Sequence, residues 1–220
     1  MAFDIHQLDG MDPTSDASSK ALDRYQKELL QNFYESPEAA DLVKADPRTG
    51  SWAEQMLEFG FSYLGATPPR LTASQAEEIL TELFPRKISL SSPDEADTVL
   101  PELVAFWSFL EREYHLPNAP AILSLLRKLQ PEFKRLMNDP SKFGLAKSFF
   151  MAGQAAGFDM TDEKQLQQFA YLYNASLAAE HEEPDEGRPG YRGASASGRK
   201  LRYRIRKLGR QARKRNRKKR

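Results

Sequence analysis

Residues 51–64 read SWAEQMLEFGFSYL, and their apolar side chains recur at the three- and four-residue steps of an α-helix. Seven apolar or aromatic residues cover most of the circumference of this helix: Trp52, Met56, Leu57, Phe59, Phe61, Tyr63 and Leu64. A helix that is apolar on nearly all sides has to be surrounded by other elements, so we expect it near the centre of the fold. Gly65 is a plausible C-cap for it.

On both sides of this stretch the same periodicity continues, from about Ser18 to Glu180. Stripes of this kind are formed by Leu22, Tyr25, Leu29 and Phe33, and by Leu103, Trp107, Leu110 and Tyr114. The chain shows no convincing hairpin signal and no internal repeat of 20–50 residues that would indicate a solenoid. The sequence therefore predicts an all-α fold with seven to nine helices, in a single compact acidic domain over residues 18–180.

Local signals predict where several of these helices begin. Three capping boxes pair a hydroxyl residue with Glu or Gln three positions later: Ser51 with Glu54, Thr72 with Gln75, and Ser92 with Glu95. Pro101 is expected to begin a helix after a predecessor of one or two turns, and Pro131 to kink the stripe that extends from Ile122 to Leu136.

The helical region has a polar segment on each side. Residues 1–17 predict an irregular polar arm, although Phe3, Ile5 and Leu8 are apolar enough to dock on the domain. Residues 181–198 are polar and rich in Gly, Pro and Ser, which is typical of a flexible linker. Residues 199–220 form an Arg- and Lys-rich tail.

Composition excludes several functional classes. The chain has no cysteine, which excludes disulfides, thiolate catalysis and cysteine-ligated metals. No apolar run approaches the about 18 residues of a spanning helix, and no secretory signal is recognisable, so we expect a cytoplasmic protein without integral membrane association. The three histidines are scattered, and neither a metal site nor a cofactor is expected.

Charge is strongly segregated along the chain. All 31 acidic residues lie at or before Glu186, whereas 16 of the 32 basic residues lie at or after Arg188, so the two parts carry net charges of −15 and +16. We expect the tail to bind nucleic acid, RNA or DNA, without sequence preference, since each phosphate neutralised by Lys or Arg releases condensed counterions. The expected binding residues are Arg199, Lys200, Arg202, Arg204, Arg206, Lys207, Arg210, Arg213, Lys214, Arg215, Arg217, Lys218, Lys219 and Arg220.

Other interpretations of the tail stay open at this point. It is also suited to a targeting signal, to binding anionic lipid, or to acting as an intramolecular counter-charge for the acidic domain. The helical domain would then be a protein–protein interaction domain. In each case the expected function is non-catalytic, that of an adaptor or regulatory protein. No sequence motif supports the alternative that the protein is an enzyme using carboxylates on its helices.

Within the helical domain, the other candidate sites favour structural interpretations. Glu111 and His115 are four residues apart on one helix face, a weak acid–base or ion pair. Six basic residues (Arg127, Lys128, Lys134, Arg135, Lys142 and Lys147) are better explained as a solvated helix face than as an extension of the basic surface. The segment Gly144–Ser148 lacks the glycines of a phosphate-binding loop. The small residues Gly144, Ser148, Ala152 and Ala156 predict a helix-packing surface.

Residues 85–119 (PRKISLSSPDEADTVLPELVAFWSFLEREYHLPNA) and 139–153 (DPSKFGLAKSFFMAG) are similar to helical regions of bacterial proteins that have no assigned activity. This resemblance implies an all-helical fold and favours a bacterial cytosolic setting. It implies no site residue.

Overall fold

A computed structural model describes residues 3–181 of the chain, with side chains placed up to residue 175. The described residues are all helical and contain no strand, which confirms the predicted fold class. The helices are α1 (Asp16–Tyr34), α2 (Ala40–Ala45), α3 (Ser51–Leu64), α4 (Ala73–Glu78), α5 (Phe84–Lys87), α6 (Ala96–Tyr114), α7 (Ala119–Leu129), α8 (Phe133–Met137), α9 (Leu145–Ala156) and α10 (Glu163–His181). A π-helical turn, Ile79–Leu83, joins α4 to α5 without a break, so the described residues form nine helices.

The described residues divide into two compact units, one up to Phe143 and one from Gly144 onward. The sequence pattern predicts one domain over residues 18–180. A helical stripe shows that a helix buries one face, but it does not show which other helix covers that face. The division falls between the 3-10 turn Pro140–Lys142 and α9.

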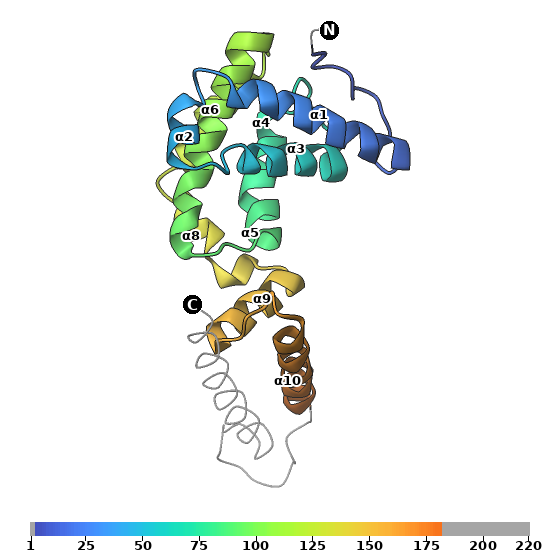
Figure 1. Cartoon of the computed structure of the whole chain (residues 1–220), viewed down its shortest axis with the longest axis vertical. Helices are drawn as coiled ribbons and strands as arrows, with labels where there is room; N and C mark the ends of the chain where they lie inside the picture. Colours follow the sequence, from blue (N-terminus) through green and yellow to red (C-terminus); the bar gives the residue numbers. More distant parts are fainter. Residues whose placement is uncertain (1–2, 182–220) are drawn as a thin grey trace. The chain divides into compact units, whose positions relative to one another are not determined.

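In the first unit, α6 lies at the centre of the core and contacts α3, α7 and α8. Its side chains Leu103, Phe106, Trp107 and Leu110 are almost completely buried. Helix α3 contributes a second set of buried residues to the same core, as its apolar circumference predicts. Figure 1 shows α1 and α3 side by side, with α6 crossing near one end of both.

The helix starts show which local signals hold. Thr72 and Gln75 form both hydrogen bonds of a capping box, as predicted. The boxes expected at Ser51 and Ser92 are wrong, since neither side chain caps its helix. The residue before α3 is Gly50, whose φ of 104° lies in the left-handed region that glycine adopts easily. Because Gly50 has no side chain, the cap of α3 has to come from elsewhere.

The structure departs from both proline predictions, in different ways. Pro131 separates α7 from α8, where the sequence predicts one kinked helix; the missing N–H and the bulk of the ring end the helix instead. The expectation that Pro101 begins a helix is wrong, because Pro101 lies inside α6. It is the sixth residue of that helix, so it removes only the bond to the carbonyl of Asp97, close to the helix start.

The N-terminal arm is irregular, as predicted, but it is packed on the domain. Ile5 and Leu8 are buried, and the Tyr25 hydroxyl on α1 donates to the Ile5 carbonyl at 3.0 Å. Asp9 accepts hydrogen bonds from the Thr67 hydroxyl and pairs with Nε of Arg70 at 3.0 Å. The arm is therefore part of the first unit's core along this segment.

The second unit has its own small core, in which α9 packs against α10. The core consists of Phe158, Met160, Phe169 and Leu172, and Ala152 and Ala156 of the small-residue strip pack against it. Gly153 of α9 lies so close to Met160 that an added Cβ would stand 2.1 Å from Sδ of Met160.

Candidate functional site

The predicted nucleic-acid-binding residues, Arg199 to Arg220, lie outside the described residues, as does the linker from residue 182 onward. That expectation therefore stays a prediction. The basic face expected between Arg127 and Lys147 can be assessed, because its side chains are described.

Carboxylates pair with several cations of that basic face. Lys134 on α8 lies 2.6 Å from both Asp94 and Asp97. Nζ of Lys142 lies 2.8 Å from Glu82 and also donates to the carbonyl of Thr81. These contacts connect elements of the first unit, so a structural role explains these two lysines.

Other members of the face have local contacts. Arg135 pairs with Glu132 at 3.4 Å, one turn away on the chain. Lys147 on α9 is almost fully buried, and burial lowers the pKa of its ammonium group to about 8. These four residues are thus in quite different environments.

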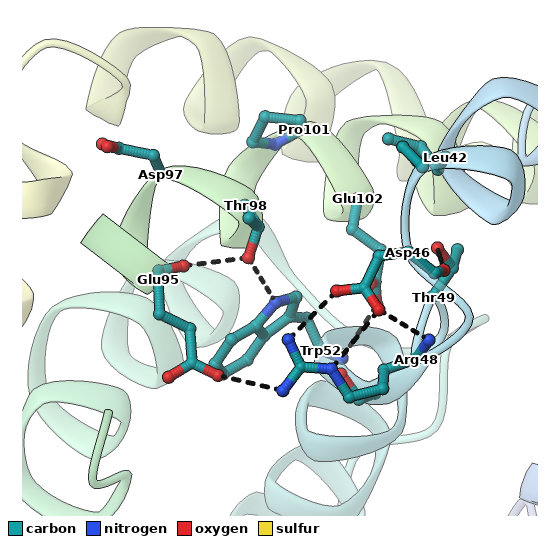
Figure 2. A pocket seen from close by; sticks show the side chains of 12 residues that line it. Leu42, Asp46, Arg48, Thr49, Trp52, Glu95, Asp97, Thr98, Pro101 and Glu102 are labelled. Atoms are coloured by element: carbon teal, nitrogen blue, oxygen red, sulfur yellow. Dashed lines mark hydrogen bonds and ion pairs between the residues drawn. The ribbon is translucent and has the colours of Figure 1, made fainter. Parts of the chain in front are cut away.

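A pocket with a volume of about 220 Å³ lies between the α2–α3 connection and the first half of α6 (Figure 2). We call it the Trp52 pocket. Its lining residues are Leu42, Ala45, Asp46, Arg48, Thr49, Ser51, Trp52, Glu95, Asp97, Thr98, Pro101 and Glu102. The rim residues are exposed or half-buried, whereas Trp52 and Glu102 are buried and form the floor.

Glu102 supplies the cap that Gly50 lacks. Its Oε1 accepts the backbone N–H groups of Trp52 at 2.8 Å and of Ala53 at 2.9 Å, so a carboxylate on α6 occupies the N-terminus of α3. The positive end of the helix dipole favours a carboxylate there. Burial raises the pKa of the Glu102 carboxyl above its usual 4.5, and the backbone N–H groups oppose that shift.

Arg48 lies across the mouth of the pocket between two carboxylates. Its Nη2 lies 3.1 Å from Oδ2 of Asp46 and its Nε 3.3 Å from Oδ1, a two-point contact, while Nη1 lies 3.8 Å from Glu95. Figure 2 shows the guanidinium between these two side chains. Hydrogen bonds from Arg48 lower the pKa of the Asp46 carboxyl. The Arg48 side chain is still 70% exposed, so solvent competes for it.

The indole of Trp52 is fixed in orientation. Its Nε1–H donates to Oγ1 of Thr98 at 2.9 Å, and the Thr98 hydroxyl in turn donates to the backbone carbonyl of Glu95. Asp97 points away from this group in Figure 2 and binds Lys134. Besides Asp97, three acidic residues line the pocket: Asp46, Glu95 and Glu102.

This arrangement is suited to binding a cation and has few groups for acid–base chemistry. No group of three or more His, Asp or Glu side chains among residues 3–175 is close enough to hold a metal ion. His115 is exposed and caps α6 in a left-handed conformation, with its backbone N–H donating to the carbonyl of Glu111. No helix in the described part of the chain is long and apolar enough to cross a membrane.

A second hollow, of about 470 Å³, lies beside the C-terminal end of α6. Arg112 there donates to both carboxylate oxygens of Glu38, at 2.7 and 3.1 Å, and to Glu113 at 2.7 Å. These hydrogen bonds hold the pKa of the Glu38 carboxyl below its usual value. Arg112 therefore forms ion pairs with two carboxylates beside this hollow.

Comparison of the chain with protein-family models, with curated proteins and with solved structures finds no match.

Sequence reasoning missed the Trp52 pocket, although one signal for it is present. Glu102 lies on the same helical face as Val99, Leu103 and Phe106, so an acidic residue interrupts an apolar stripe. A buried carboxylate needs a partner. The sequence gives no indication that this partner is the start of a helix 50 residues earlier.

Proposed function

We propose that the protein is a non-catalytic adaptor whose basic C-terminal segment, residues 199–220, binds RNA or DNA without sequence preference. The observation that supports this proposal is the segregation of charge: every acidic residue lies at or before Glu186, and 16 cations follow from Arg188 onward. A segment of this charge density gains affinity for any polyanion by counterion release.

The rest of the chain is a poor competitor for phosphate. Residues 1–181 contain 16 basic and 27 acidic residues, a net charge of −11. Of its basic side chains, Lys134, Lys142, Arg112 and Arg48 already contact carboxylates. Affinity for nucleic acid should therefore come from the tail, while the acidic part limits non-productive binding.

The experiment measures binding of the full chain to a fluorescent 20-nucleotide RNA and to a duplex DNA at several salt concentrations. If six tail cations contact phosphate on the duplex, raising the salt from 50 to 200 mM should weaken binding by about three orders of magnitude. The slope of the logarithm of the binding constant against the logarithm of the salt concentration reports the number of ionic contacts.

A matched pair of full-length variants assigns the binding to the tail. One replaces Lys214, Arg215, Arg217 and Lys218 with Gln, and the control replaces the exposed Lys20, Arg24, Lys27 and Lys44 of α1 and α2 with Gln. Both remove four positive charges, but only the tail variant should lower the salt slope, by up to about four. Equal slopes in the two variants, or no binding by the unmodified chain, would reject the proposal.

A further inference from the structure

We infer that the Trp52 pocket is a binding site for the side chain of an arginine presented by a peptide segment of a partner protein. This inference goes beyond nucleic-acid binding and does not depend on it, since all residues of the pocket lie between Leu42 and Glu102.

The charge of the interior favours a cation. Asp46, Glu95 and Glu102 are among the residues that line it, and Arg48 is the one basic residue that lines it among the described residues. Each carboxylate already accepts at least one hydrogen bond, and together they still leave an excess of negative charge. A cation that enters also offsets the burial of the Glu102 carboxylate, which has only backbone N–H groups as partners.

The shape of the contacts favours a guanidinium over an ammonium group. Arg48 itself makes a two-point contact with Asp46 and reaches Glu95 with its other nitrogen. A planar fork therefore fits between these two carboxylates, whereas an ammonium group would act there as a point charge. Arg48 is largely exposed and lies on the loop before α3, so an incoming arginine can displace it at small cost.

The apolar part of the pocket suits the methylene stem of the same side chain. Leu42, Pro101 and the indole of Trp52 line it beside the carboxylates. Because the Trp52 indole is held by Thr98, this wall is preformed and loses little conformational freedom on binding. An arginine buries its stem against such surfaces while its head contacts the charges.

The test uses the full chain and two blocked pentapeptides, acetyl-Gly-Gly-Arg-Gly-Gly-amide and the same peptide with citrulline, which has the shape of arginine without its charge. The chain has two tryptophans, so an NMR spectrum of the ¹⁵N-labelled protein shows two indole N–H signals. Trp52 lines the pocket, whereas Trp107 is buried with its Nε1–H on Sδ of Met56 and serves as the internal reference.

The arginine peptide should shift the Trp52 indole signal saturably and leave the Trp107 signal in place, and the citrulline peptide should bind at least about tenfold more weakly. Arg48→Gln removes the internal competitor and should strengthen binding, whereas Asp46→Asn should weaken it about fivefold. Asp41→Asn removes the same charge from an exposed residue of α2 outside the pocket and should have little effect.

Three results would overturn the inference. They are the absence of a saturable shift at Trp52, equal binding of the arginine and citrulline peptides, and equal effects of Asp46→Asn and Asp41→Asn. A failure of this test leaves the salt-dependent binding of nucleic acid by the tail untouched, because that experiment changes no residue that lines the pocket.

Discussion

Oε1 of Glu102 lies 2.8 Å from the backbone nitrogen of Trp52, so a side chain on α6 caps a helix whose own sequence lacks a cap. The same carboxylate accepts from Ala53. This one contact fixes the start of α3 against the middle of the core and places the floor of the Trp52 pocket.

Glu102→Ala should destabilise the first unit. The substitution leaves the N–H groups of Trp52 and Ala53 without their acceptor, and a buried group left in that state costs about 1–3 kcal/mol. Urea denaturation followed by circular dichroism measures the change. Glu54→Ala is the matched control, because Glu54 is exposed and makes no capping contact; it should cost less than about 0.5 kcal/mol. A larger loss from Glu54→Ala would restore the capping box at Ser51.

The pKa of Glu102 predicts a pH dependence with a definite sign. Since burial raises the pKa of this carboxyl in the folded protein, the folded state holds its proton to higher pH than the unfolded state does. The contribution of Glu102 is fully present below about pH 4.5 and is lost as the pH rises through the raised pKa. The free energy of unfolding of the unmodified protein, taken relative to Glu102→Gln, should therefore fall with rising pH across that window. A difference that rises with pH would contradict the assignment.

Tyr25→Phe should loosen the N-terminal arm. The substitution removes the hydroxyl that donates to the buried carbonyl of Ile5, at a cost of about 1–2 kcal/mol, while the ring keeps its contacts. Hydrogen exchange over residues 3–11 should become faster than in the unmodified chain. Tyr63→Phe removes a hydroxyl from a half-exposed ring and should leave that exchange unchanged.

Gly153→Ala should destabilise the α9–α10 unit, although alanine is normally the better helix residue. The new methyl group would stand 2.1 Å from Sδ of Met160, and such overpacking costs about 1–3 kcal/mol. The double variant Gly153→Ala, Met160→Ala should lose less than the sum of the two single changes, because removing the thioether makes room for the methyl group. Strict additivity in thermal denaturation would show that the two side chains do not meet.

Local patterns were sufficient to predict the helical class, the burial of α3 in the core, the cap at Thr72 and the stop at Gly65. These features depend on residues within one or two turns of each other, so their physics can be worked out from a short window of sequence. Charge segregation belongs to the same category, because a sum of charges needs no coordinates.

The features of the candidate site that the sequence pattern missed depend on residues far apart in the chain. Glu102 and Trp52 are 50 residues apart, and Lys134 and Asp97 are 37 apart. Ser51 looks like a cap in a local window, but the N-cap residue is Gly50, the N–H of Glu54 donates to the Gly50 carbonyl, and the buried carboxylate of Glu102 accepts from Trp52 and Ala53. The Trp52 pocket exists only because α3 and α6 pack against each other. Hydrophobic burial drives that packing and is non-directional, so a local sequence pattern does not show which two helices meet.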